Sequence, residues 1–200
     1  MTYTLVGKVG NGVEPAHLDG MFRVRREQFA ERLGWDVSVD PSGREFDFYD
    51  TIGPVYVLAL DDESERCVGG LRLLPTTGPN MLKDIFRETL RCESFVPSRN
   101  VWEISRLAVA GNPAEGGFGF GETPASLIRA MLAEASRVGL TALVGVTTTS
   151  VTRMMRGFGL DVERLGEPAV IGSARSVAFR LPISDRMLQR VGVPVRRRAA

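Results

Sequence analysis

The chain has 200 residues, of which 44% are hydrophobic and 24% are charged, and its formal net charge at pH 7 is +1. This length supplies enough apolar side chains for one well-packed domain, and the balanced charge excludes a disordered polar chain and a dedicated polyanion binder. No apolar run approaches the length of a membrane span, and residues 1–20 lack the apolar core of a signal peptide. We therefore expect a cytoplasmic protein that does not insert into a membrane.

The first part of the chain predicts a long helix. Apolar residues at helical spacing predict this helix over residues 15–33, and Gly34 is expected to end it. Its apolar face consists of Leu18, Phe22, Phe29 and Leu33. Arg25 and Arg26 flank this face, and the periodicity leaves open which of the two points inward.

Two strand-like segments, residues 55–60 and 67–74, are joined by a polar turn and predict an antiparallel hairpin. Residues 80–90 predict a short helix, and residues 101–109 predict a third strand. The inward side of the short helix is expected to consist of Met81, Ile85 and Phe86.

The last part of the chain alternates between helices and strands. A helix is expected to begin at Thr123, a good N-cap residue followed by Pro124, and to extend to about Val138. The remaining predicted elements are a strand over residues 141–147, a helix over 150–157 capped by Gly157 and a strand over 176–181. This order, without a repeat or a linker, predicts one mixed α/β domain over residues 1–200, with a partly frayed basic tail from about 187 to 200.

Charged residues stand on two of the predicted strands, where an unpaired charge is costly. Arg72 lies among leucines and needs an anionic partner, for which the candidates are Asp47, Asp50 and Glu103. On a regular strand Glu103 and Arg106 face opposite ways, so they serve one site only if the strand bulges. The alternative is a surface Glu and a surface Arg on an edge strand.

Acidic and aromatic residues precede these strands. Asp47 and Asp50 lie three residues apart in a turn-rich stretch, where they form either a turn or helix cap or a carboxylate pair that attracts a cationic substrate. Phe29 and Trp35 are either core residues or a surface that stacks on an adenine or faces a sulfonium cation.

Other kinds of site are not indicated. The single histidine, His17, and the two cysteines, Cys67 and Cys92, lack metal-ligand spacing, so we expect no metal site and two free thiols. The glycine-rich residues 110–121 match neither a dinucleotide-binding fingerprint nor a P-loop, and they predict a mobile loop.

Taken in order, these motifs resemble those of the acyl-homoserine-lactone synthases, the autoinducer synthases of quorum sensing. The resemblance rests on Arg25, Phe29, Trp35, Asp47, Asp50, Arg72-Leu-Leu-Pro-Thr-Thr, Phe86 and Trp102-Glu-Ile-Ser-Arg106, and it continues more loosely through residues 145–147 and Met154-Met155. It selects Arg25 rather than Arg26 as the inward arginine. It implies a GCN5-related N-acetyltransferase-like fold, in which helices flank a twisted mixed sheet.

The resemblance also implies a reaction. Such an enzyme makes an N-acyl-homoserine lactone from S-adenosylmethionine and a fatty-acyl thioester of acyl carrier protein or coenzyme A. N-acylation is followed by lactonisation, which releases methylthioadenosine. S-adenosylmethionine is then a substrate rather than a cofactor, and neither nucleic acid nor a membrane is an expected partner.

Site residues follow from the same resemblance. It implies that the S-adenosylmethionine site is built from Arg25, Phe29, Trp35, Asp47, Asp50, Arg72 and Arg106. The attacking amine must be neutral, and since an ordinary α-amino group has a pKa of about 8, a carboxylate is the natural base. Our hypothesis is that Glu103 is this base, with Asp47 as second choice, and that backbone donors near Arg106 stabilise the tetrahedral oxyanion.

The acyl chain is expected in an apolar cleft. Its predicted wall consists of Phe86, Val144, Val146, Thr147, Met154, Met155 and Phe158. Ordinary core packing is the alternative for Val144, Val146, Met154, Met155 and Phe158. Thr147 matches a family position that is linked to recognition of 3-oxo substitution, although Thr148 and Thr149 leave the register open by one residue.

Two other functions fit parts of the pattern. One is a related N-acyltransferase that acts on another amine, for which the acidic and aromatic residues would not be needed. The other is a non-catalytic sensor or nucleic-acid partner that uses the basic segment 186–198, but no helix-turn-helix or stacking motif accompanies that segment.

Overall fold

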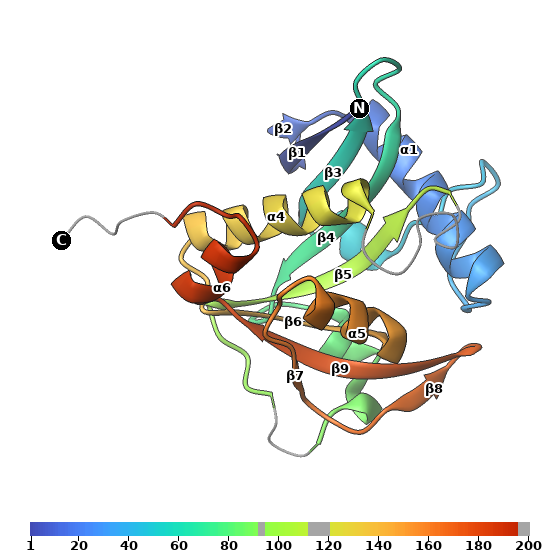
Figure 1. The fold of residues 1–200 in the computed structure, drawn as a ribbon. Helices are drawn as coiled ribbons and strands as arrows, with labels where there is room; N and C mark the ends of the chain where they lie inside the picture. The colour runs from blue at the N-terminus through green and yellow to red at the C-terminus, as the bar shows by residue number, and fades with distance from the viewer. Residues whose placement is uncertain (92–94, 112–120, 196–200) are drawn as a thin grey trace.

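The computed structural model describes residues 1–91, 95–111 and 121–195, and in this part of the chain nine strands form one sheet. The strands are β1 (Thr2–Val9), β2 (Gly12–Val13), β3 (Val55–Asp61), β4 (Cys67–Pro75), β5 (Val101–Val109), β6 (Ala142–Thr148), β7 (Glu163–Arg164), β8 (Ala169–Ile171) and β9 (Ala174–Pro182). Their order across the sheet is β2-β1-β3-β4-β5-β6-β9-β7, and β8 also pairs with β9. The pairs β1–β2 and β5–β6 are parallel and the other pairs are antiparallel, so the sheet is mixed (Figure 1).

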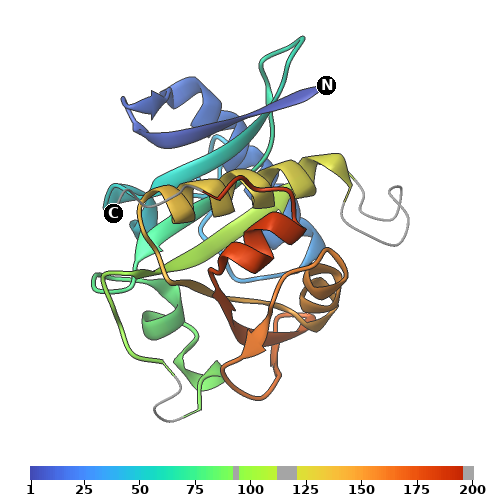
Figure 2. The same cartoon turned by 60° about the vertical axis from the view of Figure 1, so that its left-hand side comes forward.

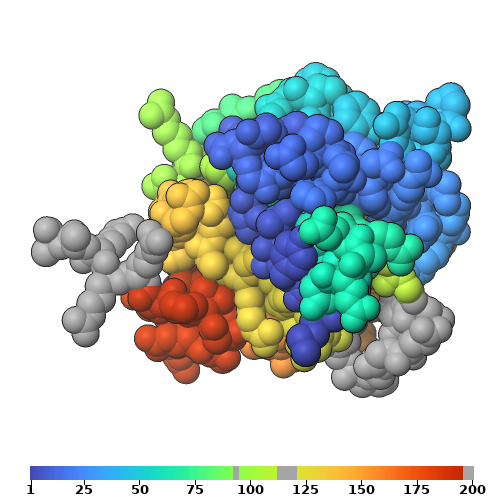
Figure 3. All heavy atoms as spheres, turned by 90° about the horizontal axis from the view of Figure 1, so that it is seen from above, coloured from blue at the N-terminus to red at the C-terminus, as the bar shows by residue number. Residues whose placement is uncertain are grey.

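Helices cover both faces of the sheet (Figure 1). They are α1 (Pro15–Arg26), the π-helix η1 (Glu27–Arg32), α2 (Phe48–Thr51), α3 (Met81–Asp84), the 3-10 helix η2 (Arg87–Thr89), α4 (Glu122–Arg137), α5 (Thr149–Gly157) and α6 (Asp185–Arg190). α4 crosses one face of the sheet, and α6 lies beside it (Figure 2). In Figure 3, β1 (dark blue) lies next to α4 (yellow), in agreement with the contacts between these two elements.

The alternating side chains of β3 explain why helices must cover both faces of the sheet. Val57 and its alternate neighbours pack with α4 in the largest core cluster, whereas Tyr56, Leu58 and Leu60 pack with Met21 and the rest of α1 on the opposite face. Because successive side chains of a strand point to opposite faces, a strand that is apolar throughout is buried on both sides.

The parallel pair β5–β6 opens the sheet near its centre. Its ladder joins residues 101–104 to residues 142–145 and stops there, although both strands continue. Beyond Ile104 and Gly145 the strands are therefore no longer paired with each other. This divergence leaves a space between β5 and β6 through which the two faces of the sheet can connect.

A β-bulge interrupts the pairing of β5 with β4. Gly70 pairs with Ala108 and Arg72 pairs with Ser105, so two steps along β4 correspond to three along β5. Arg106 lies inside this bulge, and its φ of 56° is in the left-handed region that non-glycine residues rarely adopt. The predicted bulge is confirmed, and it brings consecutive side chains of β5 to one face.

Most predicted elements are present with small changes of boundary. The hairpin β3–β4, the strand β5 and the strand β6 are confirmed, and the long first helix is α1 continued by the π-helix η1. Gly34 has a φ of +60°, which agrees with its expected place at the helix end. π-Helical turns are rare and occur frequently at functional sites.

Several expectations were wrong. Residues 80–90 form two short helices rather than one, and Ile85 is 55% exposed because α3 ends at Asp84. The N-cap of α4 is Gly121 rather than Thr123, and α5 ends with Phe158 as C-cap rather than Gly157.

The prediction of a frayed tail from about residue 187 onward was wrong for the first residues of that range. α6 starts at Asp185, and the core takes up Met187, Leu188, Val191 and Val193. The strands β1, β7 and β8 and the helix α6 are not among the predicted elements. The expectations for Cys92, for most of the glycine-rich loop and for the last basic residues fall outside the described residues.

Candidate active site

Arg25 is the inward arginine of α1, as the resemblance selects. Its side chain is fully buried, whereas Arg26 on the next position is partly exposed. The Arg25 guanidinium donates from Nη1 and Nη2 to the two oxygens of Asp50, at 2.9 and 3.0 Å. Its Nε donates to Glu45. Burial by itself lowers the pKa of Arg25, but Asp50 and Glu45 outweigh that effect and raise it above its ordinary value.

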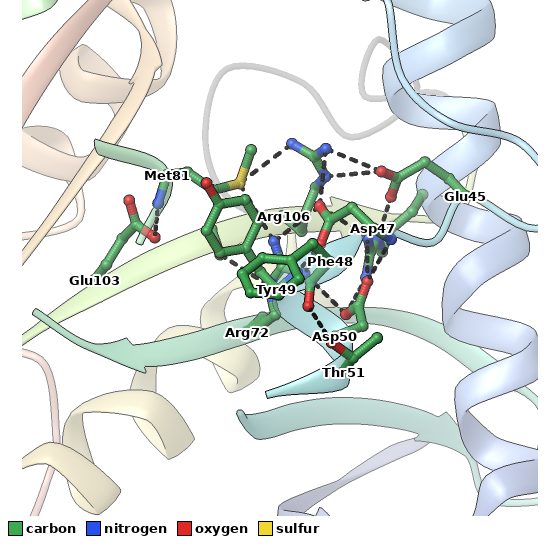
Figure 4. Close-up of polar contacts among 12 residues, drawn as sticks. Glu45, Asp47, Phe48, Tyr49, Asp50, Thr51, Arg72, Met81, Glu103 and Arg106 are labelled. Atoms are coloured by element: carbon green, nitrogen blue, oxygen red, sulfur yellow. Dashed lines mark hydrogen bonds and ion pairs between the residues drawn. The ribbon is translucent and has the colours of Figure 1, made fainter. Parts of the chain in front are cut away.

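Glu45 is a site residue that the sequence patterns do not predict. Its carboxylate is fully buried and lies between two arginines, with Oε2 on Arg25 and Oε1 at 3.0 Å from Nε and 2.9 Å from Nη2 of Arg106 (Figure 4). No local pattern marks it, since its partners are 20 and 61 residues away in the sequence. The need of buried arginines for carboxylates is the one signal that points to it.

Asp47 and Asp50 form the helix cap that the sequence allows, and both carboxylates also pair with arginines of the protein. Asp47 is the N-cap of α2 and accepts from the Tyr49 N–H at 2.8 Å, while Asp50 accepts from the Asp47 N–H at 3.0 Å. Tyr56 donates its hydroxyl to Asp50 at 2.9 Å. Burial raises the pKa of Asp50, but Arg25 and Arg72 outweigh burial and lower it to about 2.

Arg72 has the anionic partners that the sequence predicts for it. Its Nη1 lies 2.6 Å from Asp47 and 2.9 Å from Asp50, and its Nε donates to the Ser105 hydroxyl at 3.1 Å. The third candidate partner, Glu103, makes no ion pair with it. Arg72 is fully buried and spans from β4 to α2, so it holds α2 on the sheet.

Arg106 completes this cluster, which we call the ion cluster: Arg25, Glu45, Asp47, Asp50, Arg72 and Arg106 (Figure 4). Its Nη2 lies 3.2 Å from Asp47, and its guanidinium carbon lies 5.2 Å from the centre of the Phe29 ring. The cluster pairs three guanidinium groups with three carboxylates. Among the arginines of the cluster, it is Arg106 that lines the cavity described below, which we call the main cavity.

Glu103 stands apart from the ion cluster. Its two carboxylate oxygens accept the backbone N–H groups of Met81 and Leu82, the first residues of α3 (Figure 4). Burial raises the pKa of Glu103 to about 7, against the lowering effect of these two hydrogen bonds. The alternative of an exposed Glu on an edge strand is wrong, because β5 lies between β4 and β6 and the side chain is buried. A carboxylate with a pKa near neutral suits proton transfer.

The main cavity has a volume of about 330 Å³ and connects the two faces of the sheet. Glu103, Ser105 and Arg106 line its polar end, where the β-bulge brings them together. Most of the other lining residues are apolar, among them Leu71, Ile104, Ile128, Met131, Val146, Val151, Met154, Met155 and Phe179, and Gln28, Arg32, Thr147, Thr148 and Ser150 add further polar side chains. Ile128 and Met131 belong to α4, so the cavity passes the point where β5 and β6 diverge and reaches the helix on the other face.

The structure brings only some of the residues of the predicted acyl-chain wall to the main cavity. The residues that line the cavity are Phe86, Val146, Thr147, Met154 and Met155. Val144 and Phe158 are not in its wall. Val144 packs in a separate cluster with Leu82, and Phe158 lies under the Arg129 guanidinium.

Phe29 and Trp35 lie side by side at the cavity, with ring centres 5.1 Å apart. Phe29 is carried by η1, and the backbone N–H of Trp35 donates to its carbonyl at 2.8 Å. Of the seven residues assigned to S-adenosylmethionine, these two and Arg106 line the cavity. Arg25, Asp50 and Arg72 are buried behind Arg106, and Asp47 is 15% exposed.

The described part of the chain shows neither a metal site nor a membrane-spanning helix. Within residues 1–91, 95–111 and 121–195, no group of three or more His, Cys, Asp and Glu side chains is placed to hold a metal ion. Cys67 in the same ranges is a free, buried thiol, and burial raises its pKa to about 11. No described helix has both the length and the apolar character to cross a membrane.

The mixed sheet flanked by helices has the fold of the GCN5-related N-acetyltransferases. A putative N-acetyltransferase from Lactobacillus plantarum shares the fold with a TM-score of 0.60 at 18% identity, over 92% of this chain and 99% of the other. The family model described as autoinducer synthase matches residues 11–191, and the chain belongs to this family. The predicted fold class and family are thereby confirmed.

Named relatives share most of their length with this chain. An acyl-homoserine-lactone synthase of Pseudomonas aeruginosa is 39% identical over 170 residues, which cover 84% of each protein. One of Aliivibrio fischeri is 34% identical over 174 residues, which cover 86% of this chain and 89% of the relative. The crystal structure of the AHL synthase LasI superimposes with a TM-score of 0.86 at 35% identity and covers 99% of both chains. The predicted enzyme class agrees with these names.

Proposed function

We propose that this protein synthesises an N-acyl-homoserine lactone from S-adenosylmethionine and an acyl thioester. One observation carries the proposal: a single cavity is lined both by the polar side chains of Glu103, Ser105 and Arg106 and by a larger set of apolar side chains. A polar amino acid derivative and an acyl chain that react with each other need such a divided site. A related synthase, BjaI, has been solved with SAM and isopentyl-CoA, with a TM-score of 0.79 at 28% identity over 96% of this chain and 91% of BjaI.

The polar end suits S-adenosylmethionine. The Arg106 guanidinium lines the cavity there and is suited to the substrate carboxylate, and the faces of Phe29 and Trp35 are suited to the adenine or the sulfonium. The buried part of the ion cluster holds Arg106 in place through Glu45 and Asp47. Arg25, Asp50 and Arg72 therefore act on the substrate through other residues.

Glu103 is the proposed general base. The substrate ammonium must lose a proton before its nitrogen attacks the thioester carbonyl, and Glu103 accepts this proton directly or through one water. Each Glu103 oxygen is held by one backbone N–H and keeps a further lone pair. Asp47 is less suited, because its oxygens face Arg25, Arg72 and Arg106.

Two bond changes then complete the reaction. The amine nitrogen attacks the thioester carbonyl carbon, and donors near Arg106 stabilise the negative charge that develops on the carbonyl oxygen. When this intermediate collapses, the amide forms, the thioester carbon–sulfur bond breaks and the carrier thiol leaves. The substrate carboxylate then attacks its own γ-carbon, and methylthioadenosine leaves with the electron pair of the broken carbon–sulfur bond. This second step requires mainly a fixed orientation. We assign no cofactor to either step and place the enzyme in the cytoplasm.

The apolar part of the cavity is the proposed acyl site. Met131, Met154 and Met155 contribute flexible side chains that adapt to different chains. Thr147 lines the same space, and its hydroxyl is the proposed donor to an oxygen on the acyl chain.

The test is a reaction of the purified protein with S-adenosylmethionine and an acyl thioester. We expect lactone and methylthioadenosine in equal amounts by mass spectrometry, with neither product when one substrate is omitted. Thiol release without methylthioadenosine would contradict the proposal and favour an N-acyltransferase for another amine. Mass spectrometry of lactones from a bacterial culture that expresses the chain then identifies the acyl group.

A further inference from the structure

The turn between β8 and β9 lies against the segment that carries Trp35. The Ser173 hydroxyl donates to the Leu33 carbonyl at 2.9 Å, although 140 residues separate them in the sequence. Leu33 is the C-cap of η1, so this bond satisfies a carbonyl that the π-helix leaves without a helical partner. The hairpin of β8 and β9 can be followed at the edge of the sheet in Figure 1.

Gly172 makes the closest approach of this turn to the indole. A Cβ at this position would lie 2.7 Å from Cδ1 of Trp35 and 3.1 Å from the Leu33 carbonyl oxygen. The first distance is shorter than real contacts of a Cβ atom. Gly172 also has a φ of +58°, so a side chain here meets both a backbone restriction and the indole ring.

Trp35 depends on packing for its orientation. Its indole Nε1 is buried, and within the described residues no acceptor lies in hydrogen-bond reach of it. The contacts that fix the ring are Phe29 at 5.1 Å, Phe86 at 6.1 Å between ring centres, and the turn at Gly172. Phe29, Trp35 and Phe86 line the main cavity, whereas Gly172 and Ser173 are exposed and do not.

We propose that Gly172 and Ser173 are positioning residues for the S-adenosylmethionine end of the site. They act through Trp35: Gly172 allows the turn to pack on the indole, and Ser173 ties the turn to the chain just before it. This inference rests on the proposed function for the identity of the substrate. The placement of Trp35 by the turn does not depend on that identity.

The experiment compares Gly172→Ala and Ser173→Ala with a matched control, Gly10→Ala. Gly10 also lies in a turn between strands and has a φ of +72°, but nothing lies within 4 Å of the position of its Cβ. The control therefore carries the same backbone strain without a contact to displace. KM and kcat are measured for each substrate, and unfolding in urea verifies that each variant is folded.

We expect Gly172→Ala to raise the KM for S-adenosylmethionine about tenfold, because a displaced indole weakens binding of this substrate. Ser173→Ala is expected to raise it about threefold, the effect of one neutral hydrogen bond. The KM for the acyl thioester and all constants of Gly10→Ala are expected to stay at the values of the unmodified chain. Equal constants for Gly172→Ala and Gly10→Ala would overturn the proposal.

A second measurement separates this inference from the proposed function. Trp35 and Trp102 are the two tryptophans of the chain, so Trp102→Phe leaves Trp35 as the reporter of fluorescence. In that background Gly172→Ala is expected to shift the emission and Gly10→Ala to leave it unchanged. An unshifted emission contradicts the positioning role, whereas a shift in a protein that makes no lactone contradicts only the proposed substrate.

Discussion

Each charged side chain of the ion cluster is held by charges from distant parts of the chain. Glu45 is the clearest case, since its carboxylate bridges Arg25 on α1 and Arg106 on β5 without contact with water. Removing one partner from such a buried arrangement leaves the others desolvated and uncompensated. The stability of the fold and the order of the site therefore depend on the same residues.

Glu45→Gln is expected to lower the free energy of unfolding by about 3–5 kcal/mol, since it leaves buried guanidinium charge without its partner. Unfolding in urea measures this change. The control is Glu31→Gln, which removes an ion pair with Arg26 in which both side chains are partly exposed, and we expect a change of less than about 1 kcal/mol. Equal effects of the two substitutions would show that Glu45 carries no buried charge interaction.

Glu103→Gln is expected to lower kcat by about a hundredfold or more, the usual contribution of a general base, with little change in methylthioadenosine binding. The ionised carboxylate is the active form, so kcat of the unmodified enzyme should rise with pH through about 7, where burial places its pKa. The variant should lose this rise. Glu163→Gln, which changes a partly exposed pair with Arg180, is the matched control. A retained pH profile in Glu103→Gln would remove Glu103 as the base.

For single residues, the sequence predicts a role in the site where the residue type is unusual at its position. Arg72 and Glu103 are recognisable because a charge on a strand requires an explanation, and Arg25 is recognisable through the family motif. Glu45 is not, because it lies in a polar stretch where nearby carboxylates such as Asp40 are exposed or pair locally. Val144 and Phe158 fail as cavity residues for a related reason: apolar side chains of the core and of a cavity have the same pattern.

The bulge in β5 and the divergence of β5 from β6 make room for the site. Gly145 is the last residue of β6 that pairs with β5, and a Cβ there would lie 2.6 Å from the Ile104 carbonyl oxygen and 3.2 Å from the Phe179 ring. The close approach of the two strands thus ends at a residue without a side chain.

Gly145→Ala is expected to destabilise the fold by about 1–3 kcal/mol, because the added methyl group pushes β6 away from a backbone atom that cannot move freely. Urea unfolding gives the value. Gly157→Ala is the control: nothing lies within 4 Å of its Cβ position in α5, so the helix should gain stability by up to about 1 kcal/mol. A neutral Gly145→Ala would mean that the strands have room to separate further.

Elements with strong periodicity are predictable, and those that rest on tertiary contacts are not. β3 and β4 are continuous apolar runs, and the bulge follows from the requirement that Glu103 and Arg106 share a site. The strand β1 pairs with β3 over six residues, yet its sequence around Gly7 lacks a clear alternation. The helix α3 is short because it depends on the hydrogen bonds that Asn80 and Glu103 accept from its backbone N–H groups, rather than on helix propensity. Sequence alone does not show these tertiary contacts, and it therefore predicts a longer helix.

On the scale of the whole molecule, the C-terminal segment closes the largest core cluster. Met187, Leu188, Val191 and Val193 pack in it with α4, and Arg129 on α4 donates to the Val191 carbonyl at 3.1 Å. A basic composition conceals this role in the sequence, because the arginines around these apolar residues dominate the pattern. The segment is part of the fold rather than an appendage to it.

Deletion of residues 187–200 is therefore expected to abolish cooperative folding. Each buried side chain of this kind contributes about 1.5–3 kcal/mol, so the loss of four approaches the whole stability of a domain. Circular dichroism during thermal unfolding and lactone production by the truncated chain are the measurements. A truncated protein with an unchanged midpoint would show that α4 keeps its packing without this segment.

The equal numbers of guanidinium and carboxylate groups in the ion cluster have a consequence for how substrate arrives. Opposite charges a few ångströms apart cancel beyond roughly a Debye length, about 8 Å at 0.15 M salt, and the chain as a whole has a net charge of only +1. The site then exerts no long-range pull on S-adenosylmethionine, and its affinity arises only on contact. We expect kcat/KM for this substrate to change by less than about twofold when the ionic strength rises tenfold. A steep fall would reveal a steering field from elsewhere on the surface.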